Sequence, residues 1–294
     1  MKRPRHLALA MILFAWLAPA MALAQSGPTA LEPVRIGLTP VFLDDLTASL
    51  ERWRSYLEQR LQRPVVFTQR ANYRAIIDLL LEKKLDFAWI CGYPYTRYAS
   101  WLQLLAVPVY QDQPLYRSYL IVPAADTRTQ SLAELRGKVF AYADPDSNSG
   151  YLVTQYRLLQ MGADPQRFFR KAFFTWAHRK VVEAVAAGLA DGGAVDGYVW
   201  DTLAKLHPEL TAQTRIVETS PTYGFPPFVA RTGVAQSAVA ALRSVLLGMH
   251  ADPEGRLLLE RLNLDGFIAG EPALFGEIAQ MKTYVMGKTR VTQP

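Results

Sequence analysis

The most constraining feature of this 294-residue chain is an internal repeat, in which one pattern occurs twice about 105 positions apart. Both copies, Tyr73–Tyr93 and His178–Tyr198, read as a helix, an aspartate thirteen residues after the first residue, a short apolar strand and a Gly-Tyr pair. The apolar positions of the two helices also correspond, and they are Ile76, Ile77 and Leu80 in the first copy and Val181, Val182 and Val185 in the second. Since a solenoid needs three or more repeats, two copies predict two lobes of similar construction.

Strand and helix patterns alternate along the first part of the chain. Val34–Leu38, Pro64–Thr68 and Phe87–Cys91 are short and apolar, as strands are, and Asp45–Leu61 and Ala71–Lys84 have helical spacing between them. This alternation predicts an α/β fold with mainly parallel sheets, in which ligands bind at the carboxyl ends of the strands.

We expect the chain to cross between the two lobes twice, near residues 117–122 and again near residues 214–228, where several prolines occur. Lobe 1 is then discontinuous and comprises residues 25–118 and 221–294, while lobe 2 comprises residues 119–220. Two lobes joined by two crossings form a hinge, and the loops that face one another form a cleft that can close on a ligand.

Residues 1–24 have the three parts of a signal peptide. A basic start precedes the apolar run Leu7–Leu17, and Ala22-Leu-Ala24 fits a signal-peptidase site. The apolar run is too short for a stable transmembrane helix, and no cysteine follows the signal to carry a lipid anchor. We therefore expect an exported protein that is cleaved near Ala24 and resides in a bacterial periplasm.

Composition argues against several other classes of function. The formal net charge of +6 falls to +3 when the three basic residues of the signal peptide are removed, and basic residues form no long runs, so nucleic acid is not an expected partner. The single cysteine, Cys91, excludes an internal disulfide. We expect a monomer without a cofactor or a metal.

A turn rich in capping residues lies between a predicted strand, Lys138–Tyr142, and a predicted helix, Tyr151–Met161. Ser147, Asn148 and Ser149 are residue types that accept hydrogen bonds from the first N–H groups of a helix. A helix start that presents hydroxyls and unpaired N–H groups can bind an oxyanion. A capping turn that binds nothing is the simpler explanation of this segment taken alone, so the rest of the chain decides between the two.

Candidate ligand-binding residues follow the carboxyl ends of the predicted strands. They offer hydroxyl, amide, imidazole and phenol donors and one carboxylate, and they are Thr39, Tyr93, Ser147, Asn148, Ser149, His178 and Asp196. Neutral donors suit a small, enclosed anion, and Asp196 can accept a hydrogen bond from the P–OH group of a monoprotonated phosphonate or phosphite. Two simpler interpretations remain open, namely Asp196 as a strand-end cap and His178 as an ordinary first residue of a helix.

Three segments carry a resemblance to a known family. They are Tyr142–Leu152, Gly162–Phe169 and Phe174–His178, the last of which leads to Ala194-Val-Asp196. From about Val34 to Arg231 the chain resembles the phosphonate/phosphite-binding family of periplasmic solute-binding proteins. The resemblance implies a two-lobed, type II binding-protein fold, an oxyanion held between the lobes, and delivery to the membrane permease of an ATP-driven importer.

The resemblance also implies roles for individual residues. The Ser-Thr-Ser-Gly loop of the family corresponds to Ser147–Gly150, with Asn148 in place of threonine, and its Gly-Ser-His turn corresponds to Trp176-Ala177-His178. Its aspartate corresponds to Asp196 and its first-lobe tyrosine to Tyr93. Further aromatic residues near the predicted cleft are candidates to shape a pocket, and ordinary core or rim positions are the simpler interpretation of them; they are Tyr95, Tyr116, Trp176, Tyr198 and Trp200.

The sequence therefore predicts a non-enzymatic periplasmic receptor that captures a small phosphorus oxyanion for an ABC transporter. A Ser-His-Asp hydrolase would use Ser149, His178 and Asp196, but no Gly-x-Ser-x-Gly elbow is present. The stronger alternative is a sensor of the same fold that signals to a membrane histidine kinase and binds another ligand, such as arsenite through Cys91. The simpler interpretation of Cys91 is a small buried apolar residue.

Overall fold

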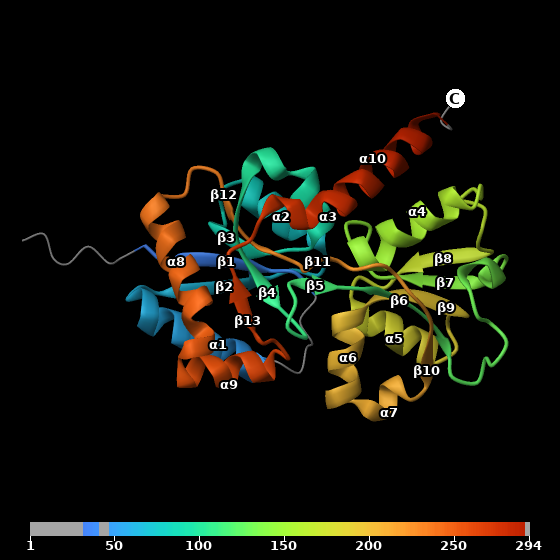
Figure 1. Ribbon diagram of the computed structural model, residues 1–294, viewed down its shortest axis with the longest axis horizontal. Coiled ribbons are helices and arrows are strands. Elements are labelled where there is room, and N and C mark those ends of the chain that lie inside the picture. The colour runs from blue at the N-terminus through green and yellow to red at the C-terminus, as the bar shows by residue number, and fades with distance from the viewer. Residues whose placement is uncertain (1–31, 41–46, 292–294) are drawn as a thin grey trace, which may run out of the picture. The chain divides into compact units, whose positions relative to one another are not determined.

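The computed structural model describes residues 32–40 and 47–291 (Figure 1). The predicted signal peptide lies outside the described residues, so its assignment stays a prediction. Within the described ranges, no helix combines the length and the apolar character that crossing a membrane requires.

One sheet of six strands, called sheet A, is built from segments near both ends of the described chain. In spatial order its strands are β13 (Gly266–Ile268), β4 (Leu102–Val109), β12 (Phe228–Arg231), β3 (Phe87–Trp89), β1 (Val34–Leu38) and β2 (Val65–Gln69). The helices of the same segments are α1 (Thr47–Leu61), α2 (Tyr73–Leu81), α3 (Gly92–Arg97), α8 (Gln236–Gly248), α9 (Pro253–Arg261) and α10 (Gly276–Val291). Short 3₁₀ turns accompany them at Ala99–Trp101, Met249–Ala251 and Pro272–Phe275.

A second sheet of five strands, called sheet B, is built from the middle of the chain. In spatial order its strands are β10 (Thr214–Thr219), β6 (Ser118–Pro123), β9 (Gly192–Asp196), β7 (Val139–Tyr142) and β8 (Lys171–Phe174). The helices of this segment are α4 (Val153–Gln160), α5 (His178–Ala186), α6 (Gly197–Leu206) and α7 (Pro208–Thr211). Two short turns belong to it as well, the 3₁₀ turn Leu132–Leu135, which begins with a capping box of Ser131 and Glu134, and the π-helical turn η4 (Asn148–Leu152).

The internal repeat is present in the structure as two equivalent three-stranded units. In sheet A the strand order β2-β1-β3 is parallel throughout, and in sheet B the order β8-β7-β9 repeats the same arrangement. The helices α2 and α5 occupy equivalent positions in the two units, and their corresponding apolar residues are all fully buried. The predicted similarity of the two parts of the chain is therefore confirmed.

The sheets are mixed, whereas the sequence predicted mainly parallel ones. β12 pairs antiparallel with β3 and β4, and β6 pairs antiparallel with β9 and β10. β12 and β6 lie outside the repeated units. β12 and β13 are short apolar runs whose partners are distant in the sequence. Local alternation of helix and strand therefore gives no signal for them. The predicted limits of the two lobes stay a prediction.

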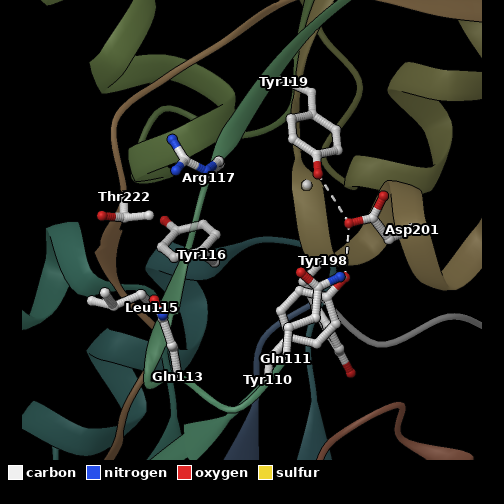
Figure 2. Close-up of a pocket in the computed structure, with 11 residues that line it drawn as sticks. Tyr110, Gln111, Gln113, Leu115, Tyr116, Arg117, Tyr119, Tyr198, Asp201 and Thr222 are labelled. Carbon is white, nitrogen blue, oxygen red and sulfur yellow. Dashed lines mark hydrogen bonds between the residues drawn. The ribbon is translucent and has the colours of Figure 1, made fainter.

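Two short strands lie where the chain passes between the sheets, β5 (Leu115–Tyr116) and β11 (Tyr223–Gly224), and they pair antiparallel. A cavity of about 220 Å³ lies beside them (Figure 2). In it Asp201 of α6 accepts hydrogen bonds from the hydroxyls of Tyr110, at 2.7 Å, and Tyr119, at 3.0 Å. Because Tyr110 follows β4 and Tyr119 belongs to β6, this carboxylate ties the end of a sheet A strand to sheet B.

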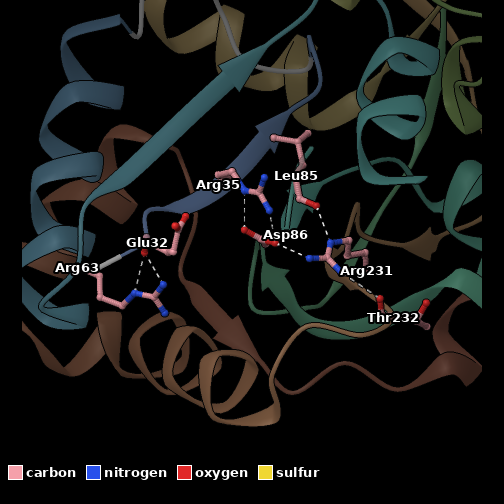
Figure 3. A network of polar contacts seen from close by, with 7 residues as sticks. All are labelled: Glu32, Arg35, Arg63, Leu85, Asp86, Arg231 and Thr232. Atoms are coloured by element: carbon pink, nitrogen blue, oxygen red, sulfur yellow. Dashed lines mark hydrogen bonds and ion pairs between the residues drawn. The ribbon is translucent and has the colours of Figure 1, made fainter. Parts of the chain in front are cut away.

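An ion-pair network lies at the amino-terminal ends of β1 and β3 (Figure 3). The carboxylate of Asp86 accepts two hydrogen bonds of 2.9 Å from Arg35 of β1 and a third of 2.9 Å from Arg231 of β12. Burial alone would raise the pKa of Asp86, but the hydrogen bonds and charges of the two guanidinium groups outweigh it and hold the pKa below its ordinary value. Asp86 thus fastens three neighbouring strands of sheet A to one another.

Replacing Asp86 by alanine is expected to lower the free energy of unfolding by roughly 2 kcal/mol at pH 7, because two partly buried guanidinium groups lose their partner. Since the folded-state pKa is depressed, this stabilisation is present above about pH 4 and is lost as the pH falls further. Urea unfolding at pH 7 and pH 3 measures both effects. The control is Glu82→Ala, which removes an exposed ion pair with Lys84 and is expected to cost less than about 0.5 kcal/mol; equal losses in the two variants would contradict the prediction.

Candidate functional site

Equivalent positions of the two repeats meet in one buried polar cluster. Tyr73 and His178 begin helices α2 and α5, while Cys91 and Asp196 are the N-cap residues of α3 and α6. Each of the four exposes at most 2% of its surface. Burial first, and then neighbours that include Cys91 and Asp196, raise the pKa of Tyr73 well above its ordinary value. We call this group, with four further residues, the polar cluster; its members are Tyr73, Cys91, Tyr116, Ser147, Asn148, Ser149, His178 and Asp196.

The turn between β7 and α4 is held in one conformation by its own residues. The Ser147 hydroxyl accepts a hydrogen bond of 2.9 Å from the Gly150 N–H, and the Ser147 carbonyl accepts one of 3.0 Å from Leu152. Ser147 is therefore the predicted capping residue. Only glycine fits at position 150, since a Cβ atom there would lie 2.5 Å from the Cβ of Ala143 and 2.9 Å from Cε1 of His178.

Asn148 joins this turn to residues of the first repeat and of β5. Its backbone N–H donates to the Sγ atom of Cys91 at 3.2 Å, and its side-chain Nδ2 donates to the Tyr116 hydroxyl at 2.9 Å. Its Oδ1 atom and the hydroxyl of Tyr73 are buried without a hydrogen-bond partner among the described residues. Because such an atom costs about 1–3 kcal/mol, two of them in one cluster indicate a place that receives a ligand.

Asp196 is a buried carboxylate that forms no ion pair with a described lysine or arginine. Burial raises its pKa to about 7, although the N–H groups of Val199 and Tyr198 and the Ser149 hydroxyl lower it in part. Its hydrogen bonds are long, 3.4 Å from the Val199 N–H and 3.5 Å from the Ser149 hydroxyl. The carboxylate is thus the N-cap of α6, as the simpler interpretation held. Because its hydrogen bonds are long, it can still accept a further hydrogen bond.

His178 is neutral, and its hydrogen bonds define which ring nitrogen carries the proton. The Asp196 backbone N–H donates to Nδ1 at 3.0 Å, and burial lowers the pKa of the imidazole to about 3. The proton therefore sits on Nε2, which lies 3.4 Å from the Ser147 hydroxyl oxygen. The ring can donate one hydrogen bond into the polar cluster.

Two of the predicted site residues, Thr39 and Tyr93, share no side-chain hydrogen bond with members of the polar cluster among the described residues. The Thr39 hydroxyl donates to the Trp89 carbonyl at 3.1 Å, which anchors the end of β1 to β3. The charges that act on the Tyr93 phenol, whose pKa burial raises, are chiefly those of Arg97 and Asp146. Its backbone N–H is among the groups that act on Cys91, so Tyr93 adjoins the polar cluster. The other five predicted residues are brought together as expected.

Two tyrosines of the polar cluster, Tyr73 and Tyr116, were not among the predicted ligand-binding residues. The sequence could have indicated Tyr73 as a candidate site residue, because the repeat aligns it with His178. Tyr116 had only its aromatic character, because it lies on the short strand β5, whose pairing with β11 is not visible in the sequence. Trp176, by contrast, is 45% exposed, has a left-handed backbone (φ 68°) and packs on Phe174, so it does not line the polar cluster.

A charged bridge flanks the polar cluster and joins α2 and α3 to the turn that follows β7. Asp146, the residue before Ser147, accepts two hydrogen bonds of 3.0 Å from Arg74 of α2, and Arg97 of α3 lies 3.4 Å away. The carboxylate of Asp144 accepts the Tyr73 N–H at 3.0 Å. This group, Arg74, Arg97, Asp144 and Asp146, is termed the charged bridge.

Metal chemistry has no obvious ligand set here. Within the described ranges, no three or more histidine, cysteine, aspartate or glutamate side chains are grouped as a metal ion would require. The polar cluster instead presents hydroxyl and imidazole donors around one carboxylate and one thiol, and this set suits a small anion that still carries a proton.

Comparison with known families gives one match over most of the chain. Residues 36–275 match the family model described as "ABC transporter, phosphonate, periplasmic substrate-binding protein". The chain is 23% identical over 237 residues to a probable ABC transporter phosphite binding protein, PhnD1, of Prochlorococcus marinus, which covers 76% of this chain and 80% of that one. It is 25% identical over 243 residues to the phosphonates-binding periplasmic protein of Escherichia coli, covering 79% and 71% of the two chains.

Solved structures agree with this fold. A binding protein component of an ABC phosphonate transporter from Pseudomonas aeruginosa superposes with a TM-score of 0.82 at 22% identity, covering 89% of both chains. PhnD1 of Prochlorococcus marinus in complex with methylphosphonate superposes with a TM-score of 0.77 at 21% identity, covering 86% of this chain and 98% of that one. The predicted two-lobed, type II binding-protein fold is confirmed at the level of the fold.

Proposed function

Because the chain belongs to the family of periplasmic substrate-binding proteins of phosphonate ABC transporters, we propose that it captures a small phosphorus oxyanion in its polar cluster. The ligand is a phosphonate, phosphite or phosphate, and it is delivered to a membrane permease for uptake. The protein works in the periplasm as a monomer after removal of a signal peptide near Ala24.

The observation that carries this proposal is the combination of unpartnered polar atoms and an unpaired carboxylate in one enclosed place. The Tyr73 hydroxyl, the Nε2–H of His178 and the hydroxyls of Ser147 and Ser149 supply neutral donors for the anionic oxygens. The carboxylate of Asp196 accepts a hydrogen bond from a P–OH group of the ligand. An ionised ligand is then held by dipoles rather than by a buried lysine or arginine.

Ligand capture requires the polar cluster to open and close. Its residues come from the predicted lobe 1, such as Tyr73 and Cys91, and from the predicted lobe 2, such as Asn148 and Asp196. We propose that the two crossings near β5 and β11 act as the hinge, and that contacts such as Asn148 with Cys91 form when the lobes close on the ligand.

An enzyme role is not favoured by the geometry of Ser149, His178 and Asp196. The Ser149 hydroxyl donates to Asp196 rather than to His178, and the imidazole receives the backbone N–H of Asp196 rather than its carboxylate. A nucleophile, a base and an orienting acid are therefore not connected in series. Binding without turnover is the proposed activity.

The sensor alternative included arsenite as a ligand, and this part of it requires a thiolate at Cys91. Burial raises the pKa of this thiol to about 11, and the chain has no second cysteine to complete a sulfur site for arsenite. The matching family and its relatives are transport proteins, which favours uptake over signalling.

Thermal unfolding with a panel of oxyanions tests the proposal. At pH 7.5 and a concentration about a hundred times the dissociation constant, phosphite or methylphosphonate is expected to raise Tm by about 5 °C or more. Sulfate, which has no proton to give to Asp196, and arsenite are the controls and are expected to leave Tm unchanged. A protein that ignores every phosphorus oxyanion, or responds equally to sulfate, contradicts the proposal.

A further inference from the structure

Cys91 occupies the position in the first repeat that Asp196 occupies in the second. Each residue follows the carboxyl end of a strand, precedes a Gly-Tyr pair and is the N-cap of the next helix. Unlike the Asp196 carboxylate, the Cys91 side chain makes no capping hydrogen bond. The two repeats therefore offer different chemistry at equivalent places of the polar cluster.

The Cys91 side chain is a neutral thiol that lies against the groups proposed to hold the ligand. Its sulfur receives the Asn148 N–H at 3.2 Å. Burial first, and the charge of Asp196 in part, raise its pKa to about 11, although the N–H groups of Asn148 and Tyr93 and the Tyr116 hydroxyl lower it in part. A neutral thiol is a weak donor and a weak acceptor, and it behaves as a small apolar surface.

A second observation indicates that this thiol faces a ligand rather than an ordinary core. The unpartnered Oδ1 atom belongs to Asn148, whose backbone contacts the sulfur, and the unpartnered hydroxyl of Tyr73 lies near it as well. Apolar packing around Cys91 would leave the Tyr73 hydroxyl without a partner, whereas an oxygen of an oxyanion held in the polar cluster can accept its hydrogen bond. The Asn148 Oδ1 atom accepts a hydrogen bond only from a protonated oxygen of the ligand.

We propose that Cys91 selects the non-oxygen substituent of the ligand, so that the site prefers methylphosphonate and phosphite to phosphate. This inference rests on the proposed function and names the residue that decides among the phosphorus oxyanions. Three oxygens of the ligand face the neutral donors and Asp196, and the methyl group or hydrogen on phosphorus faces the sulfur of Cys91.

The selection follows from the cost of burying an oxygen without a strong donor. Phosphate would place its fourth oxygen against a thiol that cannot replace the hydrogen bonds of water. An apolar surface of this size rejects an added hydroxyl by about a hundredfold. Serine at the same position would supply a full hydroxyl donor and remove the penalty, whereas alanine would keep the surface apolar.

Calorimetry at pH 7.5 with methylphosphonate, phosphite and phosphate, on the wild type and on Cys91→Ser and Cys91→Ala, tests this inference. The wild type is expected to prefer methylphosphonate to phosphate by about a hundredfold. The serine variant is expected to lower that ratio at least tenfold through tighter phosphate binding, and the alanine variant to keep it within about threefold. Melting curves show whether each variant is folded.

Several results would overturn the inference and leave the proposed function standing. One is a wild type that binds phosphate as tightly as methylphosphonate, a measurement that needs no variant. Another is a folded serine variant whose selectivity is unchanged, and a third is an alanine variant that loses selectivity as the serine variant does. Failure of the wild type to bind any phosphorus oxyanion would instead remove the proposed function itself.

Discussion

Asparagine in place of Asp196 is expected to stabilise the closed conformation at pH 8 by roughly 2–4 kcal/mol. The carboxylate is buried without a cation, and its pKa of about 7 lies well above that of an exposed aspartate. Because the folded-state pKa is raised, the stabilisation associated with this group is present below about pH 4 and is lost as the pH rises through 7. The asparagine variant keeps an oxygen to cap α6 and has no charge to bury.

The same variant is expected to lose discrimination between protonated and fully ionised oxyanions. The wild-type carboxylate accepts a hydrogen bond from a P–OH group and repels sulfate, whereas the amide of an asparagine can donate a hydrogen bond to a sulfate oxygen. We expect sulfate affinity to rise by about a hundredfold, with a smaller change for methylphosphonate. Stability is measured by urea unfolding between pH 5 and pH 8, and affinity by calorimetry at pH 7.5.

The control for this experiment is Asp191→Asn. Asp191 immediately precedes the first residue of β9, whereas Asp196 is its last residue. The Asp191 carboxylate accepts the Val139 N–H at 2.7 Å and is remote from the polar cluster, so ligand preference should stay unchanged. If Asp196→Asn is no more stable than the wild type at pH 8, the buried-charge argument is wrong. If it is more stable but still rejects sulfate, Asp196 does not face the ligand.

Removal of Asp146 is expected to weaken ligand binding about tenfold, chiefly through faster release. The charged bridge joins Asp146, whose side chain is 6% exposed, to Arg74 on α2 and Arg97 on α3. In the proposed mechanism these contacts exist only when the lobes are closed. Their loss lowers the stability of the closed state by about 1–2 kcal/mol, less than for a fully buried pair because both guanidinium groups are about 40% exposed.

Stopped-flow tryptophan fluorescence on Asp146→Ala, Arg74→Ala and the double variant measures this effect. A coupling energy of about 1 kcal/mol in the release rate is expected for the pair. Arg54→Ala is the matched control, since among the described residues Arg54 pairs within α1 alone, with Glu51 and Glu58. Release rates that are the same in Asp146→Ala and in the control would show that the charged bridge does not hold the closed state.

The sequence predicted the parts of the fold that depend on local patterns and on the repeat. β1, α2, β3, β7, α5 and β9 follow from apolar spacing, and comparing the two copies places Cys91 and Asp196 at equivalent strand ends. β12 and β13 could not be predicted in the same way, because their positions depend on antiparallel partners far away in the chain. The proportion of antiparallel pairing was therefore underestimated.

The candidate site was predicted where a residue type had a local reason to be where it is. Ser147 and Asp196 are helix caps, and capping chemistry is visible in the sequence. Tyr93 was predicted from the family resemblance and from its place after a strand, and its role in binding stays a prediction, whereas the buried hydroxyl of Tyr73 was not predicted. The surroundings of that hydroxyl come from residues distant in the sequence, such as Asp144 and Asp196, which no local pattern reports.

The equivalence of Cys91 and Asp196 has a consequence for how a nearly symmetric receptor reads an asymmetric molecule. Two identical halves would present the same groups to a tetrahedral ligand from both sides. They could not distinguish the one substituent on phosphorus that differs from the other three. The two halves differ at this equivalent pair, with a thiol in one and a carboxylate in the other. In the proposed mechanism this difference orients the ligand, because the two sides of the polar cluster present different chemistry to it.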